Sequence, residues 1–204
     1  MDMEKCVEAV KDPQLCSLAG LAGQLSRMLV DCVESESLRV CYYECLKMCR
    51  NEAACLGALE VALGVTVARD VVRIATKTIC PLDDVDVKRV DIDMVALLFK
   101  GLLRKIEKME CPRRAVAARV LTIAALTLHK VFKEASEQHA QDMLMLMAPA
   151  LAAAHRCGEQ ALSMEMIEPL VGEVMKRITT ALKEGNIQIG DVSIEFEPIG
   201  LKNA

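Results

Sequence analysis

Cysteine is the residue type in this chain with the clearest capacity for chemistry. The 204 residues include 10 cysteines, and Cys41, Cys45 and Cys49 follow one another at intervals of four. In a helix this interval places their sulfur atoms along one face. Thiolates arranged in this way suit Cu(I) or zinc, and Met48 adds a soft sulfur beside them. We call Cys41, Cys45 and Cys49 the three-cysteine stripe; it is the candidate site for metal binding or redox chemistry.

The segment from Cys32 to Cys55 resembles cysteine-rich four-helix metal-storage proteins, whose bundles are lined by repeated Cys-x3-Cys pairs. The resemblance covers residues 32–55 and implies metal binding inside a bundle. The helices expected after residue 81 carry only Cys111 and Cys157, so they do not supply a comparable lining.

Two Cys-x9-Cys spacings, Cys6 with Cys16 and Cys45 with Cys55, resemble the twin Cys-x9-Cys proteins of the mitochondrial intermembrane space. The resemblance implies two antiparallel helices joined through these cysteines. An expected helix break falls inside each of the two spacings, at Pro13 and Asn51.

A structural role is the third interpretation of the cysteines. We expect roughly four to eight of them to form disulfides or to pack as small apolar side chains, bracing the N-terminal half of the fold. Their spacing does not define the connectivity. The structural role is expected for five residues: Cys6, Cys16, Cys32, Cys55 and Cys80.

Motifs of catalysis are absent from the sequence. The three histidines, His129, His139 and His155, form no His-x3-His or His-Glu-x2-His pattern. No Gly-x-Ser-x-Gly motif occurs, and no glycine-rich phosphate loop follows a strand. We therefore expect a non-enzymatic protein with no catalytic residues and no cofactor.

A basic cluster provides a possible contact with phosphate groups. It consists of Arg104, Lys105, Lys108, Arg113 and Arg114, with Glu107 and Glu110 among them. The net charge of −4 and an aromatic content of 2% favour a solvated helix surface over a nucleic-acid site. A nucleic-acid-associated accessory subunit is accordingly the second alternative function, after the metal-binding or redox protein.

Helices are expected to position these residues. Apolar residues recur at steps of three and four, which predicts a mainly α fold of six to eight helices in an orthogonal or up-down bundle. Pro149 is expected to kink one helix, Gly185 to cap the last, and residues 81–91 to form a linker. The expected helices cover residues 2–11, 13–33, 37–49, 52–79, 94–109, 113–135, 137–156 and 164–184.

The C-terminal segment has a different pattern. Apolar and polar residues alternate on either side of Gly190-Asp191, which predicts a short β-hairpin. We expect residues 1–185 to form the bundle and residues 186–204 a hairpin arm, which acts either on its own chain or on a neighbour. The candidate interaction residues of the arm are Ile187, Ile189, Val192, Ile194 and Phe196.

Compartment and function follow from the remaining composition. No signal peptide is visible at the start, and the apolar stretches 115–128 and 143–154 fall short of the roughly 18–20 residues of a membrane span. We therefore expect a cytoplasmic protein. The small number of Asn and Gln residues favours a thermophilic source, whereas the 12 Met residues argue against one. The leading hypothesis is a structural or adaptor subunit that binds proteins or itself through apolar helices and the hairpin arm, as a homo-oligomer.

Overall fold

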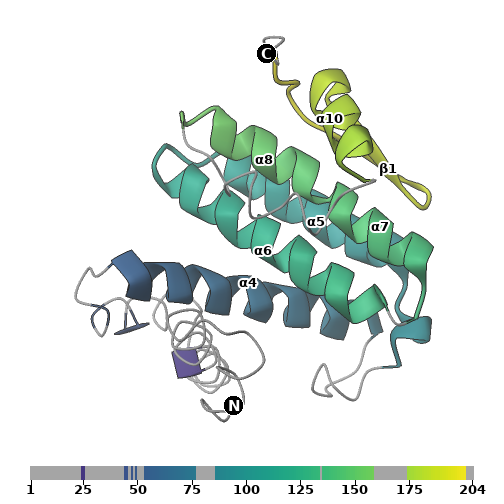
Figure 1. The fold of residues 1–204 in the computed structure, drawn as a ribbon, viewed down its shortest axis with the longest axis horizontal. Helices are drawn as coiled ribbons and strands as arrows, with labels where there is room; N and C mark the ends of the chain where they lie inside the picture. The colour runs from purple at the N-terminus through teal and green to yellow at the C-terminus, as the bar shows by residue number, and fades with distance from the viewer. Residues whose placement is uncertain are drawn as a thin grey trace. The chain divides into compact units, whose positions relative to one another are not determined.

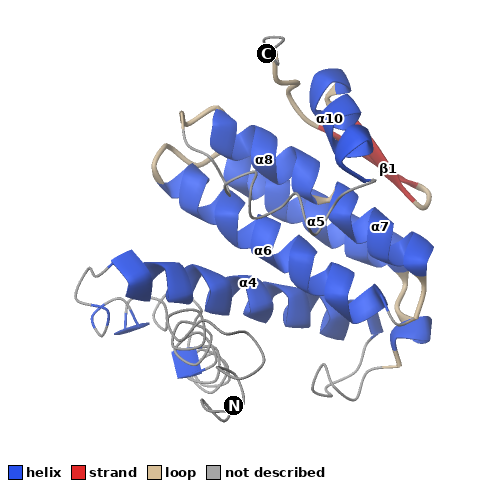
Figure 2. Cartoon of the chain, in the orientation of Figure 1, coloured by secondary structure: helices blue, strands red, loops and turns tan. Residues whose placement is uncertain are grey.

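The fold is mainly α-helical, with one antiparallel two-stranded hairpin near the C-terminus, as predicted (Figures 1 and 2). A computed structural model describes residues 24–25, 44–45, 47, 49, 53–76, 86–133, 135–158 and 174–200. The chain forms two compact units, residues 1–66 and 67–204. The hairpin belongs to the second unit.

Helix α4 (Ala53–Thr76) corresponds to the helix predicted over 52–79. Small side chains on its buried positions leave room for close packing, as the sequence pattern indicated. They include Ala58 and Ala62 in the first unit, and Ala68, Val72 and Ala75 in the second.

Helix α5 (Ile92–Glu107) begins at a side-chain cap. The Asp91 carboxylate accepts a hydrogen bond from the backbone N–H of Met94 at 3.1 Å, which satisfies one of the free donors of the first turn. A short 3-10 helix, η2 (Val87–Arg89), precedes it. At the other end, the Arg114 guanidinium donates to the carbonyl oxygens of Glu107 and Met109, both at 2.9 Å. Side-chain bonds therefore hold both ends of α5.

Helix α6 (Arg113–Lys133) packs against the pair formed by α7 (Glu137–Met145) and α8 (Met147–His155), as Figure 1 shows. Among the described helices, α6 alone is long and apolar enough to cross a membrane. Half of its most apolar stretch is buried within the protein, where it packs as a core helix.

The kink predicted at Pro149 lies three residues earlier, at Leu146, which separates α7 from α8. Proline lacks the N–H that would bond to the carbonyl four residues before it, and its ring collides with that carbonyl, here of Met145. The distortion therefore falls one turn before the proline, and Pro149 itself lies in the first turn of α8, where its missing donor costs nothing.

The expected count of six to eight helices is not met in the described residues. With α7 and α8 taken as the one kinked helix that the sequence predicted, those residues contain five α-helices. The helices expected over 2–11 and 13–33, and most of the one over 37–49, fall outside the described residues, as does the start of the helix expected over 164–184.

Helix α10 (Val174–Glu184) ends at Gly185, which takes a left-handed φ of 73° as a C-terminal glycine cap does. Strand β1 (Asn186–Ile189) follows and pairs with β2 (Val192–Glu195) in antiparallel register, with Ile189 opposite Val192. The turn predicted at Gly190-Asp191 is present, and Gly190 has a φ of 55°.

Candidate functional site

The two edges of the hairpin present different backbone groups to their surroundings. Because a two-residue turn joins the strands, Ile189 and Val192 form a hydrogen-bonded pair, and the pairing alternates from there. The bond from Phe196 N–H to the Gly185 carbonyl at 2.7 Å continues this alternation. The backbone groups of Ser193 and Glu195 therefore point outward from β2, and those of Asn186 and Gln188 point outward from β1.

Helix α5 bonds to one of the four outward backbone groups of β2 and to one group of the turn. Lys100 donates from Nζ to the carbonyl oxygen of Ser193 at 2.6 Å. Two helical turns earlier, the Asp93 carboxylate accepts a hydrogen bond from the backbone N–H of Asp191 at 2.9 Å. Two side chains on one face of α5 thus hold the hairpin at its turn and at its β2 edge.

The outer edge of β1 has no such bond among the described residues. The outward N–H and C=O groups of Asn186 and Gln188 have no hydrogen-bond partner there, and both residues are exposed. The Gln188 side chain is turned toward the hairpin's own loop, where Nε2 donates to the Gly190 carbonyl at 2.9 Å. A row of four unpaired backbone groups remains at this edge, which is the arrangement to which another strand can add.

A surface hollow of about 380 Å³ lies between β1 and α10. Helix α10 contributes positions separated by three or four residues, which form one face of the helix. Met145 of α7 also lines the hollow, but the residue is only 6% exposed, so it adds a small apolar area at the base. The lining residues are Met145, Lys176, Arg177, Thr180, Ala181, Glu184, Asn186, Ile187 and Gln188.

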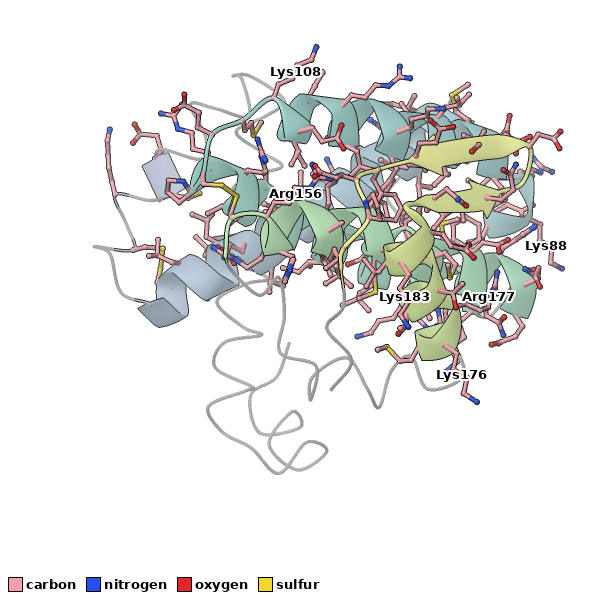
Figure 3. The ribbon with its side chains drawn as sticks, turned by 90° about the horizontal axis from the view of Figure 1, so that it is seen from above. Lys88, Lys108, Arg156, Lys176, Arg177 and Lys183 are labelled. Atoms are coloured by element: carbon pink, nitrogen blue, oxygen red, sulfur yellow. A yellow bond between two sulfur atoms is a disulfide. The ribbon has the colours of Figure 1, made fainter. Side chains whose placement is uncertain are left out.

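Positive charge predominates on α10. Figure 3 shows Lys176, Arg177 and Lys183 along this helix, and the first two line the hollow. Arg177 lies 3.4 Å from the side-chain oxygen of Gln141, whereas Lys176 has no side-chain partner among the described residues. Glu184 is the one acidic residue among the described residues that line the hollow.

Asp142 is a carboxylate buried between α7 and its neighbours, with a residue exposure of 9%. Burial raises its pKa above the ordinary value for aspartate. The hydrogen bond that Gln138 donates to it at 2.9 Å and the nearby charges of Arg177 and His139 oppose that rise. Arg177 therefore lines the hollow and also lowers the pKa of this buried acid.

The predicted interaction residues of the hairpin face the helices of their own unit. Ile187, Ile189, Val192, Ile194 and Phe196 have exposures of 3%, 0%, 8%, 1% and 9%. They form part of the same apolar core as α5, α6 and α10. Because these side chains pack inside their own chain, the part of the hairpin that a partner can reach is the backbone of the β1 edge.

The three-cysteine stripe is described in part. Cys49 forms a disulfide with Cys55, and Cys45 is a buried free thiol, while Cys41 lies outside the described residues. Burial raises the pKa of the Cys45 thiol, and the neighbouring Glu44 carboxylate raises it further. A disulfide sulfur is no thiolate ligand, and the described residues contain no group of three metal-binding side chains. Metal binding by the stripe stays a prediction that requires reduction of Cys49.

A second disulfide, between Cys111 and Cys157, joins the turn before α6 to the end of α8. The sequence had placed the bracing cysteines mainly in the N-terminal half, and no spacing rule singled out this pair. Both cysteines follow the end of a helix, which is the only local signal they share. The other cysteines expected to be structural, Cys6, Cys16, Cys32 and Cys80, lie outside the described residues.

The basic cluster is divided between two roles. Arg104, Lys105, Lys108 and Arg113 are exposed, whereas Arg114 is half-buried and holds the carbonyls at the end of α5. The exposed members surround the C-terminal end of α5, where positive charge is favoured by the helix dipole. This role in helix stability accounts for part of the cluster without a nucleic acid.

Comparison with protein-family models, with curated proteins and with solved structures finds no match for this chain. Functional inference therefore depends on the geometry of the β1 edge and its surroundings.

Proposed function

We propose that this protein is a non-enzymatic adaptor or structural subunit that binds a partner protein by strand addition at the β1 edge. The observation that carries the proposal is the difference between the two hairpin edges. Lys100 of α5 bonds to the Ser193 carbonyl in the middle of the β2 edge, while no described residue bonds to the outward backbone groups of Asn186 and Gln188 beside the hollow. Exposed strand edges of this kind accept an extended segment of another chain in β-augmentation.

The energetics favour a modest, reversible contact. Each net hydrogen bond contributes about 0.5–1.5 kcal/mol, so the four groups of the edge contribute about 2–6 kcal/mol before the entropic cost of association. Apolar contact with Met145 and Ala181 in the hollow would add only a little to this, because both residues are almost fully buried. Binding of this size suits an adaptor whose partners exchange.

Self-association through an apolar helix over 137–156 has less support. In α7 and α8 nearly all apolar side chains are buried within their own unit, so their apolar surface is already used. We therefore propose the β1 edge as the partner contact. Disulfides such as the two described here are typical of oxidising compartments, and the cytoplasmic location stays a prediction.

The test compares proline substitutions on the two edges. Gln188→Pro removes an outward N–H of β1 and blocks the edge sterically, without removing a bond between the strands. Ser193→Pro makes the equivalent change on β2 and is the matched control. The probe is a fluorescein-labelled, end-capped eight-residue peptide of alternating Thr and Val, and binding is followed by fluorescence anisotropy.

We expect Gln188→Pro to weaken binding of this peptide by about tenfold or more, which corresponds to loss of at least one hydrogen bond. Ser193→Pro should bind like the parent protein. Circular dichroism of both variants checks that the fold is retained. Equal binding by the two variants would show that the peptide does not add to β1 and would refute the proposed function.

A further inference from the structure

We infer that the segment received by the β1 edge alternates apolar and acidic residues, and that Lys176 and Arg177 of α10 select its acidic side chains. This inference rests on the proposed function and specifies the chemistry of the partner. It is carried by the side chains that surround the unpaired backbone groups.

The hollow has an apolar base and a charged rim. Met145, Ala181 and Ile187 supply apolar surface and are almost fully buried. Lys176 and Arg177 are exposed at the rim on α10. Because side chains of a strand point alternately to opposite faces, a strand added beside β1 would direct every second side chain toward the apolar base. The intervening side chains would point to the opposite, solvent-exposed face, where the charges of Lys176 and Arg177 act on them through solvent.

Charge varies along the hollow. Glu184 and Asn186 are separated only by Gly185, so the acidic end of the hollow lies where α10 passes into β1. Lys176 lies eight residues earlier in the helix, about 12 Å away along its axis. An acidic residue of the partner is thus attracted toward the Lys176 and Arg177 end and repelled from the Glu184 end.

A second copy of this chain is a poor occupant of the same edge. Strand β1 has the sequence Asn-Ile-Gln-Ile and carries no acidic residue to meet Lys176 or Arg177. A second α10 would bring a further Lys176 and Arg177, and like charges repel. Charge complementarity therefore favours a different, acidic partner segment.

The experiment uses three end-capped, fluorescein-labelled eight-residue peptides that alternate Val with Glu, with Thr or with Lys. Anisotropy titrations on the full chain should give the order Glu, then Thr, then Lys, with about tenfold tighter binding of the Glu peptide than of the Thr peptide at low salt. The difference should shrink at 0.5 M salt, because screening weakens exposed charge pairs.

The double variant Lys176→Gln with Arg177→Gln should lose the preference for the Glu peptide and bind the Thr peptide as the parent does. Lys108→Gln removes the same kind of charge from the end of α5, far from α10 in Figure 3, and should leave the preference intact. Glu184→Gln should strengthen binding of the Glu peptide, since it removes the one described acidic group that lines the hollow.

The results separate the two proposals. If Gln188→Pro abolishes binding but the order of the three peptides is unchanged in the Lys176/Arg177 variant, strand addition holds and the charge selection is wrong. If Gln188→Pro leaves all three affinities unchanged, both proposals fail. A dimer in light scattering that Gln188→Pro dissociates would make a second copy the occupant and would overturn the acidic partner.

Discussion

Replacing Cys111 and Cys157 with serine removes the covalent link across the second unit. The two Cα atoms lie 5.6 Å apart, and the disulfide closes a segment of 46 residues that contains α6, α7 and α8. Those helices contribute much of the apolar core, from Ala118 to Ala154. The link therefore restricts the unfolded chain over the segment whose packing matters most.

The size of the effect follows from the length of the closed segment. In the chain-entropy treatment, a separation of 46 lowers the entropy of the unfolded chain by about 13.5 cal/mol/K, which corresponds to about 4 kcal/mol at 25 °C. The Cys49–Cys55 disulfide closes only 6 residues, and the same treatment gives about 2 kcal/mol. The two disulfides should thus differ by about 2 kcal/mol in their effect on the free energy of unfolding.

Urea denaturation followed by circular dichroism measures this difference. With a denaturant slope of about 2 kcal/mol/M, the Cys111→Ser/Cys157→Ser variant should unfold at a midpoint about 2 M below that of the oxidised parent. The Cys49→Ser/Cys55→Ser variant is the matched control, with about half that shift. Cys111 is exposed, so reductant added to the parent should reproduce the loss.

The reasoning would be refuted by a loss of about 1 kcal/mol or less for the Cys111/Cys157 variant, or by equal losses for the two variants. Mass spectrometry after alkylation must show that the parent was oxidised at both pairs before unfolding.

Three further substitutions test the second unit. Gly190→Ala should lower the free energy of unfolding by about 1–3 kcal/mol, because φ is 55° and a Cβ would collide with the Asp93 carboxylate. Gly101→Ala, in the open interior of α5, should raise the free energy of unfolding by about 0.5–1 kcal/mol. Urea unfolding measures both changes. Asp142→Asn should stabilise the protein at neutral pH. Burial raises the pKa of Asp142 in the folded protein, so the folded state favours the neutral acid, and this contribution to stability is lost as pH rises through the pKa of the folded state. The gain should disappear below the ordinary aspartate pKa, and a gain independent of pH would contradict this assignment.

Local signals in the sequence predicted much of the secondary structure. Gly185 is predicted to end the last helix, and the helix does end there. The Gly190-Asp191 turn was predicted from the alternation on either side of it. In each case the residues that determine the structure are within a few positions of one another.

Features that depend on distant residues were not predicted. The hydrogen bond from Lys100 to the Ser193 carbonyl joins residues 93 positions apart, and the one from Asp191 to Asp93 spans 98. No residue near Lys100 in the sequence indicates that its side chain bonds to a strand edge. The Cys111–Cys157 pairing is likewise a product of the tertiary fold, because spacing alone admits many connectivities.

The unequal edges of the hairpin also limit how far this sheet can grow. Open-ended polymerisation through strands needs two free edges on every molecule, because each molecule must pair with one neighbour on either side. Here Lys100 of α5 occupies the Ser193 carbonyl in the middle of the β2 edge, so a strand added on that side would compete with this bond. The β1 edge should therefore accept an added strand more readily than the β2 edge, and Lys100 works against growth of the sheet from both sides.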